Sequence, residues 1–529
     1  MAEITPTQRG THQAPEKTDK SDTIELEHVI SPDETANKDH MNYDRVDKEL
    51  AKYADAARID ITPEENKRLK RMIDRRVLVV MVVTYFIQAL DKGTMSFASI
   101  MGIKPDLHLV GGQQYSWLTT CIYIAVLIVE YPTNWILQRV PIAKYLSLNI
   151  ILWSITLACH AACTNFASIL AVRTLLGIFE AVCQPSFLIM SSLWYRREEQ
   201  AQTVTYWYLM NGGQQIVGGL LAYCFSLISG GALKSWQVLF LTYGCISVVW
   251  GLFVLAWLPD SPMRARCFSE DDKRLMVERV RTNQTGIQNK TFRPEQMREA
   301  LTDPQTWCYC GIAICTTLPT SGLGAFYGIV VTGFDFTVLQ TQLLAMVLGA
   351  YIIAILLGST YLVKKTGQNL LIMGLFIIPS YIGTIVLMTV RNTSTSTKAA
   401  LLFSYYIVLS FWAAQTLSMS LLSRNVAGQT KKSFAVAMNF IAWSTGNAIG
   451  PQVFLDRDGP RYFIAFATHL GCYVLLTVII VFLRWHLRRE NARKDGLAEQ
   501  GVGEARDKRM VHAFDDLSDR ENVNFRYVY

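Results

Sequence analysis

Charged side chains are scarce in this sequence. Asp, Glu, Lys and Arg make up only 18% of its 529 residues, whereas 51% of the residues are hydrophobic and the mean hydropathy is +0.21. Such a composition is typical of a membrane protein and not of a soluble one. The formal net charge of +7 does not indicate a nucleic-acid partner, because in a membrane protein a basic excess mainly reflects topology.

Motifs of catalysis are missing as well. The sequence has no metal-ligand cluster, nucleophile triad or phosphate-binding loop, so we expect neither an enzyme nor a bound cofactor. Eleven cysteines occur, but most lie inside apolar runs, and Cys308 and Cys310 lack CxxC spacing, so no disulfide framework and no metal site are expected. A cleavable signal peptide is not expected either, because the first hydrophobic run begins only at Val77.

Apolar segments of spanning length recur along the chain. Crossing a bilayer takes about 20 apolar residues, and a long charged connection separates the segments into two sets of six. The sequence therefore predicts an all-α membrane protein with 12 transmembrane helices in two six-helix bundles. The predicted spans lie near 77–97, 115–137, 143–163, 166–194, 203–228, 238–257, 307–330, 341–362, 370–389, 400–422, 433–455 and 462–484.

The spans define five regions. We expect a disordered cytoplasmic tail at 1–61, an N-terminal bundle at 62–257, a cytoplasmic linker with amphipathic helices at 258–306, a C-terminal bundle at 307–485, and a cytoplasmic tail at 486–529.

Three sequence signals mark helix starts in the regions outside the spans. Thr62 with Glu65 forms a capping box, Ser269 with Asp272 forms an N-cap pair, and Pro294 opens a further short helix in the linker.

Lys and Arg gather in alternate loops between the spans. Arg196 and Arg197 follow the fourth span, Lys431 and Lys432 precede the eleventh, and the helix before the first span is also basic. Because basic loops stay on the inner side of a membrane, both termini are predicted to be cytoplasmic.

Two opposite charges lie within one apolar run. Arg173 and Glu180 are seven residues apart with Gly177 between them, so they share a helical face in the span 166–194. A charge inside a bilayer costs about 2.5–3.5 kcal/mol, so each needs a partner or a wet cavity. One interpretation is a structural ion pair that locks two helices. In the other, Arg173 binds a substrate carboxylate and Glu180 carries a proton.

Further charges lie in the first two spans. Asp91 and Lys92 interrupt the first apolar run; either they lie inside the span or the span ends at Leu90. The apolar residues after Lys92 favour the first alternative, which makes Asp91 a second candidate proton carrier and Lys92 a candidate substrate contact. Glu130 either exchanges a proton or stabilises a kink at Pro132, and both interpretations stay open.

Polar side chains recur at helical spacing on the fifth and eleventh spans. Interhelical hydrogen bonding explains each of them singly, but together they predict the lining of a substrate cavity. They are Asn211, Gln214 and Gln215 on the fifth span and Asn439, Trp443 and Asn447 on the eleventh. Asn392, in an outside loop, is a predicted glycosylation site.

Several stretches resemble one family. The segments LDKGTMSFASIMGIKPDLHL, RTLLGIFEAVCQPSF, LPDSP and NVAGQTKKSFAVAMNF are similar to the fungal allantoate permease family of the major facilitator superfamily, over about residues 60–495. This resemblance implies alternating access and proton-coupled uptake of an organic anion such as allantoate, nicotinate or biotin. It also implies that Arg173 meets the substrate carboxylate and that Glu180 is protonated, as in the similar sialin-type carriers.

Two positions depart from the pattern of this wider group. Lys92 stands where Arg is frequent, so a point charge replaces a planar fork of donors. The loop after the second span, QRVPIAKY, lacks the usual glycines and arginines.

The predicted function is thus a proton-coupled symporter of a carboxylate-bearing metabolite, driven by the proton gradient. We expect it to work as a monomer in the lipid bilayer of the plasma membrane, with no nucleic-acid partner. One alternative is a carrier that exports or imports a fungal secondary metabolite or its precursor, and a second is a membrane nutrient sensor that transports nothing.

Overall fold

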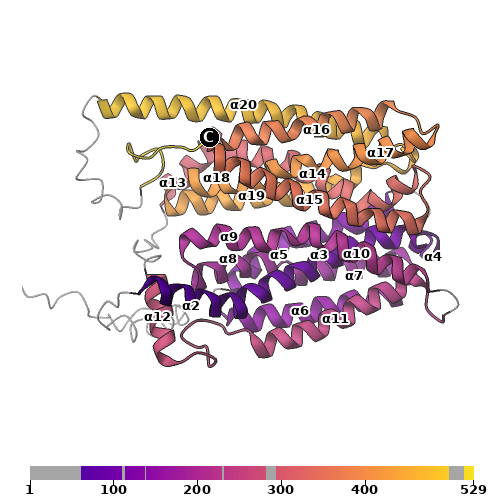
Figure 1. The fold of residues 1–529 in the computed structure, drawn as a ribbon, viewed down its shortest axis with the longest axis horizontal. Coiled ribbons are helices and arrows are strands. Elements are labelled where there is room, and N and C mark those ends of the chain that lie inside the picture. The colour runs from indigo at the N-terminus through magenta and orange to yellow at the C-terminus, as the bar shows by residue number, and fades with distance from the viewer. Residues whose placement is uncertain (1–60, 110–112, 138, 229–230, 282–292, 500–516) are drawn as a thin grey trace, which may run out of the picture.

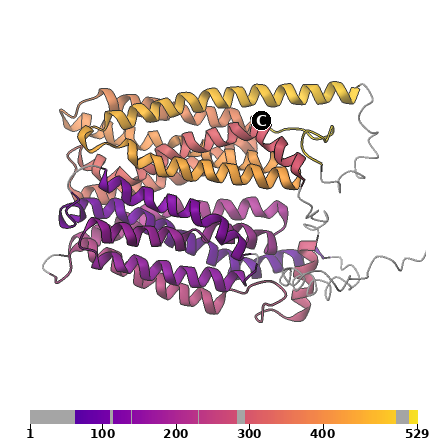
Figure 2. The same ribbon diagram turned by 180° about the vertical axis from the view of Figure 1, so that it is seen from behind.

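Two layers of long helices lie side by side (Figures 1 and 2). The computed structural model describes residues 61–109, 113–137, 139–228, 231–281, 293–499 and 517–529. The N-terminal half forms one layer and the C-terminal half the other, and within each layer the helices run roughly parallel to one long axis. We call these layers the N-bundle and the C-bundle.

Six rods form the N-bundle, and two of them are each built from two consecutive helices. In chain order they are α3 (Val79–Ile100), α5 (Gln114–Leu137), α6 (Ile142–Cys159), α7 with α8 (Phe166–Glu180 and Cys183–Trp194), α9 with α10 (Arg197–Tyr208 and Met210–Ser226), and α11 (Ser235–Trp257).

The C-bundle repeats this plan with six more rods. They are α14 (Pro304–Thr332), α15 (Val338–Thr366), α16 (Asn369–Thr389), α17 with α18 (Thr395–Val408 and Trp412–Asn425), α19 (Gln429–Ile449) and α20 (Phe463–Glu499). The last rod runs beyond the predicted span end at 484, because its basic continuation LRRENARKD keeps helical propensity after the apolar part ends.

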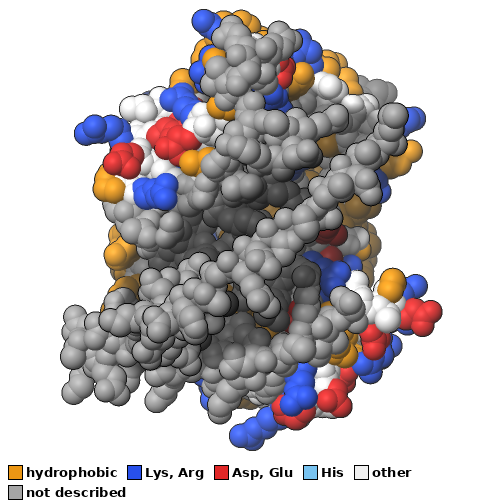
Figure 3. Space-filling view, turned by 90° about the vertical axis from the view of Figure 1, so that its left-hand side faces the viewer, with side chains coloured by type: hydrophobic (Ala, Val, Ile, Leu, Met, Phe, Trp, Pro, Cys, Tyr) orange, Lys and Arg blue, Asp and Glu red, His pale blue; other side chains and the backbone are white. Residues whose placement is uncertain are grey.

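Within the described residues, four short α-helices lie outside the rods. They are α2 (Pro63–Ile73), which leads through a π-helical turn into α3, α4 (Ile103–Asp106), α12 (Glu270–Arg281) and α13 (Pro294–Thr302). α2, α12 and α13 lie at one end of the molecule, which we call the linker end, and α4 lies at the opposite end (Figure 1). Figure 3 views the linker end, where acidic and basic side chains gather.

Nine of the described rods are long and apolar enough to cross a membrane by length and composition. The other three are α3, α9 with α10, and α19. These three carry most of the polar and charged residues that we singled out in the sequence, such as Lys92, Asn211 and Asn447, whereas Glu130, Arg173 and Glu180 lie on two of the nine apolar rods. Their lower hydropathy follows from their position, because each of them faces other helices or the space between the bundles.

The predicted helix starts are confirmed. The Glu65 amide donates to Thr62 Oγ1 at 3.3 Å and the Thr62 amide donates to the Glu65 carboxylate at 3.0 Å, which closes the capping box. In the linker, the Asp272 amide donates to Ser269 Oγ at 3.2 Å. These bonds satisfy backbone N–H groups that would otherwise lack partners in the first turn.

A buried arginine ties the linker to the N-bundle. The Arg279 side chain is fully buried, and its Nη2 contacts both carboxylate oxygens of Glu199 at 2.6 Å. Its Nε donates to Asn66 Oδ1 at 2.7 Å, and its Nη1 donates to the Trp194 carbonyl oxygen at 3.3 Å. One side chain from α12 thus joins α2, the end of α8 and the start of α9.

Replacing Arg279 with Ala is expected to destabilise the N-bundle. Removing one partner of a buried ion pair costs about 3–5 kcal/mol, because the other charge stays buried without compensation. For a bundle of this size that corresponds to a fall in melting temperature of about 10 °C. Thermal unfolding of the purified protein in detergent measures the change.

Arg68→Ala is the matched control for this variant. Arg68 pairs with Asp272 at 2.6 Å, but its side chain is 55% exposed, so we expect a loss of no more than about 1 kcal/mol. Equal melting temperatures for the two variants would contradict the structural role of Arg279.

The bundles are joined by hydrogen bonds toward the opposite end. Tyr115 Oη donates to the Ala325 carbonyl oxygen at 2.8 Å, and the Gly328 amide donates to Ser96 Oγ at 3.2 Å. Further inter-bundle bonds join Thr120 Oγ1 to the Ala448 carbonyl at 2.7 Å and Gln342 Nε2 to Ser226 Oγ at 2.7 Å.

All of these residues lie in the halves of their rods that are farther from the linker end. The bundles are therefore held together at the opposite end.

Candidate functional site

A small recess that is partly open to solvent lies between the bundles. Helices α3, α5, α7, α8 and α19 supply its walls. Charged, amide and aromatic side chains alternate around it, which is the composition of a site for a small polar ligand. The lining residues are Gln88, Lys92, Tyr123, Val126, Glu130, Glu180, Ala181, Gln184, Phe440 and Trp443.

An ion pair lies at the centre of this recess. Lys92 Nζ is 3.5 Å from Glu180 Oε2, which is an ion-pair distance but too long for a good hydrogen bond. The Glu180 side chain is 1% exposed and neither of its carboxylate oxygens has a hydrogen-bond partner. The Lys92 side chain is 30% exposed. The pair therefore keeps free donor and acceptor capacity for a ligand.

Asp91 and Lys92 both lie inside α3, which continues to Ile100, so the alternative in which the span ends at Leu90 is wrong. Consecutive residues on a helix point about 100° apart, and these two side chains separate accordingly. Lys92 faces the recess, whereas Asp91 is fully buried within the N-bundle, beside Trp153 of α6 and Tyr243 of α11 and close enough to Glu180 for the two carboxylates to repel each other. The two Asp91 carboxylate oxygens lie near these groups without hydrogen-bond geometry.

Arg173 does not line the recess. It is 1% exposed, its Nε donates to the Leu118 carbonyl oxygen at 2.9 Å, and its Nη1 has no hydrogen-bond partner. Gly177 explains this burial, because a β-carbon there would lie 2.7 Å from the Ile122 carbonyl oxygen, so α7 packs directly on α5. Because α7 and α5 lie so close together, they enclose the guanidinium of Arg173, which is one helical turn from Gly177. Arg173 and Glu180 share a helix, but only Glu180 reaches the recess.

Glu130 lines the recess and also bonds locally. Asn134 Nδ2 donates to Glu130 Oε1 at 3.2 Å and to the Glu130 carbonyl oxygen at 3.0 Å, beside the intrahelical Pro132. The second carboxylate oxygen has no hydrogen-bond partner. The structure thus places Glu130 where both of its predicted roles are possible.

Aromatic rings form one wall of the recess. Trp443 stacks on Phe440 at a centroid distance of 5.5 Å and meets Tyr123 edge to face at 5.7 Å. Phe440 and Trp443 come from α19 of the C-bundle, whereas Tyr123 comes from α5 of the N-bundle. The site therefore needs both bundles, and its flat rings suit a planar ligand group.

The other predicted polar residues divide between packing and cavities. Asn211 Nδ2 bonds Tyr85 Oη at 3.1 Å, Asn439 Nδ2 bonds Met419 Sδ at 3.3 Å, and Asn447 Nδ2 bonds the Trp443 carbonyl oxygen at 2.8 Å, as interhelical or local bonds.

The two glutamines of the fifth rod take different positions. Gln214 is 7% exposed, with its Oε1 unpartnered and close to Gly93. Gln215 lines a second small recess with Tyr327 and Trp412.

Asn392 lies in the loop between α16 and α17 at the opposite end of the C-bundle. Its Nδ2 donates to Asp335 Oδ2 at 2.5 Å and to the Phe334 carbonyl oxygen at 3.2 Å. The nitrogen that would carry a glycan is therefore engaged in two hydrogen bonds, and glycosylation would require both to break.

Sequence reasoning missed Gln88, Tyr123, Gln184 and Phe440. Two signals were available. Gln88 precedes Lys92 by one helical turn, and Tyr123 precedes Glu130 by two, so each shares a face with a residue that was singled out. The aromatic residues were not distinguishable from ordinary core residues, because rings at helical spacing are common in buried faces.

Two bundles of six rods with a charged recess between them have the architecture of a membrane carrier. The sequence matches the Major Facilitator Superfamily family model over residues 81–451, and the chain belongs to that family. It is therefore a multi-pass membrane transporter and not an enzyme.

Three relatives locate the chain within the family. It is 31% identical to allantoate permease of Saccharomyces cerevisiae, over 92% of this chain and 90% of the relative. It is 34% identical to a thiamine pathway transporter of the same yeast, over 88% and 87%. An uncharacterised transporter of Schizosaccharomyces pombe is 32% identical over 89% and 91%. The resemblance to fungal transporters of the allantoate permease group is confirmed.

Solved structures share the fold. A bacterial homologue of the human lysosomal transporter Spinster, in an inward-facing and unoccupied conformation, matches with a TM-score of 0.56 at 15% identity, over 77% of this chain and 95% of that chain.

Proposed function

We propose that this protein carries a small organic anion with a carboxylate group together with protons, by alternating access. One observation carries the proposal: the Lys92–Glu180 pair lies in the central recess, with Glu180 buried and unpartnered by hydrogen bonds. A ligand carboxylate can take the Lys92 ammonium as its partner, and a proton on Glu180 then removes the competing negative charge. Substrate and proton loading are thereby coupled.

The side chains that line the recess limit which organic anions can bind in it. Trp443, Phe440 and Tyr123 offer ring faces and edges, while Gln88 and Gln184 offer amide donors and acceptors. A planar carboxylate with hydrogen-bonding groups on its ring or chain fits these surfaces best. In this proposal Lys92 is the first cation to meet the substrate, and Arg173 reaches it only if the helices shift during the cycle.

The basic loops support an orientation with the linker end in the cytoplasm, because Arg196, Lys431 and Lys432 all lie there. With the bundles joined at the opposite end, the described conformation is then the one that opens inward. We place the carrier in the plasma membrane as a monomer that imports its substrate with the proton gradient.

A panel of labelled carboxylates, measured for uptake into cells that express the protein at pH 5 and pH 7, tests this function. We expect at least one planar carboxylate, with nicotinate as the first probe, to enter faster at pH 5. Nicotinamide is the matched control, because it keeps the ring and loses the negative charge. Faster uptake of the amide than of the acid would contradict an anion carrier.

Glu180→Gln is expected to remove the pH dependence of that uptake. The amide keeps the shape of the side chain but cannot exchange a proton, so uptake at pH 5 and pH 7 should become equal within about twofold. Glu198→Gln, at an exposed position in the first turn of α9 at the linker end, is the control and should keep the pH dependence. If the ratio of uptake at pH 5 to uptake at pH 7 were the same in Glu180→Gln as in the wild type, Glu180 would not be the residue that couples transport to protons.

A further inference from the structure

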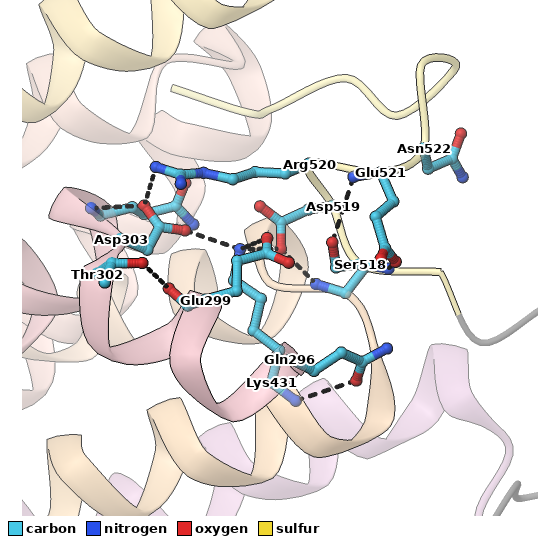
Figure 4. Close-up of polar contacts among 12 residues, drawn as sticks. Gln296, Glu299, Thr302, Asp303, Lys431, Ser518, Asp519, Arg520, Glu521 and Asn522 are labelled. Carbon is cyan, nitrogen blue, oxygen red and sulfur yellow. Dashed lines mark hydrogen bonds and ion pairs between the residues drawn. The ribbon is translucent and has the colours of Figure 1, made fainter. Parts of the chain in front are cut away.

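The last residues of the chain bind back onto the C-bundle. Residues 517–529, which we call the tail segment, run along the linker end between α13, the α18–α19 loop and α20 (Figure 4). Ser518 and Asp519 are fully buried, and Tyr527 is 5% exposed. The sequence predicted only a cytoplasmic tail for this region, so the contacts of its last residues are a new feature.

One carboxylate of the tail segment joins a charge cluster around Lys431. The Lys431 side chain is fully buried, and its Nζ lies 2.8 Å from Glu299, 2.7 Å from Asp303 and 2.7 Å from Asp519. We call these four residues the lysine cluster. Three carboxylates so close together resemble a metal site, but the Lys431 ammonium lies among them and supplies the positive charge.

The cluster keeps its lysine charged. Burial by itself lowers the pKa of Lys431, but the carboxylates of Asp519 and Asp303 outweigh that effect and raise the pKa above its usual value. Two further groups hold Asp519 in place: the Ala427 amide donates to its Oδ1 at 3.2 Å, and Tyr527 Oη donates to its Oδ2 at 2.8 Å.

Two asparagines of the C-bundle recognise the backbone of the tail segment. Asn425 Nδ2 donates to the Val528 carbonyl oxygen at 2.8 Å, and Asn425 Oδ1 accepts from the Val528 amide at 2.8 Å. Asn491 makes the same pair of bonds with Tyr527, both at 2.9 Å. Main-chain bonds of this kind bind an extended peptide independently of most of its side chains.

Ser518 lies at the entrance to this bound peptide. Its Oγ accepts a hydrogen bond from the Glu521 amide at 3.2 Å, and its own amide donates to the Glu521 carboxylate at 2.8 Å. In the sequence, Asp515 and Asp516 precede it and Asp519 and Glu521 follow it. Acidic residues on both sides of a serine are the chemistry that a protein kinase with a basic substrate groove recognises.

We propose that the tail segment is a dissociable latch on the lysine cluster, and that phosphorylation of Ser518 holds it in the released state. A kinase transfers the γ-phosphoryl group of ATP to Ser518 Oγ, which gives ADP and releases the hydroxyl proton. The kinase reaches Ser518 only while the tail segment is undocked. Each phosphorylated molecule therefore stays in the released state, so the fraction of molecules with a docked tail segment falls.

A phosphate cannot be accommodated in the docked state. It adds about 1.5–2 negative charges at neutral pH beside Asp519 and Glu521. The lysine cluster already holds three carboxylates against one ammonium, and Glu521 adds a fourth carboxylate. Arg520, which is 3.4 Å from Asp303, and the buried Lys494, which donates to the Asp519 and Asn522 carbonyl oxygens, supply two more positive charges, so the carboxylates still outnumber the cations before any phosphate is added. Full burial of Ser518 also leaves the added oxygens no contact with water. Repulsion and desolvation thus both oppose docking.

Release has a defined structural consequence. Lys431 loses Asp519 and keeps Glu299 and Asp303, while α13 loses the contact that Arg520 makes with its C-terminal end. Helix α13 follows the part of the linker that leads from the N-bundle. The latch therefore sets how firmly the linker is held on the C-bundle.

Hydrogen exchange of the full-length protein tests the latch. The protein is prepared with serine or with phosphoserine at position 518, and the exchange of the backbone amides of residues 517–529 is followed by mass spectrometry. We expect exchange in this segment to be at least tenfold faster with phosphoserine, and that of α13 to increase as well. Exchange at the same slow rate in both forms would overturn the proposal.

The matched control places phosphoserine at position 524 in place of Asn524, which is exposed in the same segment. This variant carries the same added charge outside the buried contact, so its exchange should stay within about twofold of the unmodified protein. Ser518→Ala should also remain docked, because it adds no charge. If the control at position 524 released the segment as strongly, the effect would be one of general charge and the role of Ser518 would be refuted. Rapid exchange already in the unmodified protein would refute the latch itself.

Discussion

Lys92→Met is expected to lower the apparent affinity for the transported carboxylate by about 100-fold. Lys92 is the cation that lines the recess with 30% of its side chain exposed, and a charge-assisted contact of this kind contributes about 1.5–3 kcal/mol. Methionine keeps the length of the side chain and removes the charge. The concentration dependence of uptake, with the carboxylate that enters wild-type cells fastest, measures the change.

Two variants sharpen this experiment. Lys104→Met is the control, because Lys104 lies over the Tyr115 ring at the opposite end and does not line the recess. The Lys104→Met protein should take up the carboxylate with nearly the affinity of the wild type. Lys92→Arg keeps the charge and should retain a larger part of the affinity than Lys92→Met. If Lys92→Met kept normal affinity and Arg173→Met lost it, the residue that contacts the substrate would be Arg173 and not Lys92.

Gly349→Val is expected to reduce transport by roughly 5- to 150-fold by disturbing the contact between the bundles. Gly349 of α15 faces α10, and a β-carbon there would lie 2.5 Å from the Gly212 carbonyl oxygen and 3.0 Å from Gln215 Cβ. The nearest atom is backbone and cannot move aside alone. Overpacking of this kind costs about 1–3 kcal/mol, and every 1.4 kcal/mol changes a conformational equilibrium tenfold.

Spin labels at Leu233 of the N-bundle and Arg457 of the C-bundle report the equilibrium between separated and joined bundles. Both residues are exposed and lie at the same end of the molecule, the one opposite the linker end. We expect Gly349→Val to lengthen the distance between the labels and to lower uptake in parallel. Gly358→Val is the matched control, because it lies on the same helix with open space around its β-carbon position. An unchanged distance in Gly349→Val, or an equal effect in Gly358→Val, would show that the seam between α10 and α15 does not control closure.

Much of the architecture was predictable because it depends on local sequence. Apolar segments of spanning length located the rods, and the capping residues at Thr62 and Ser269 located helix starts, since both signals act within a few residues. Glu180, which lies inside an apolar run, lines the recess between the bundles, where a buried charge has the partner or the water that it requires.

The sequence did not predict which of the charged residues faces the recess and which is enclosed by packing. Arg173 and Lys92 both lie within apolar runs, and sequence reasoning gave the guanidinium the leading role. The structure encloses Arg173 where Gly177 lets α7 pack on α5, and it leaves Lys92 facing the recess. Which cation is accessible depends on how closely two helices approach, and that distance is set by packing between residues far apart in the chain.

The sequence by itself determined that this chain crosses a membrane repeatedly, that its helices begin at capping residues, and that charges lie within its spans. Only the tertiary structure decided that Tyr123 and Trp443 share one recess, that Asp91 and Lys92 face different surroundings, and that the tail segment binds Lys431. The reason is physical: helix formation and membrane insertion depend on neighbouring residues, whereas burial and charge pairing depend on partners that only the folded chain brings together.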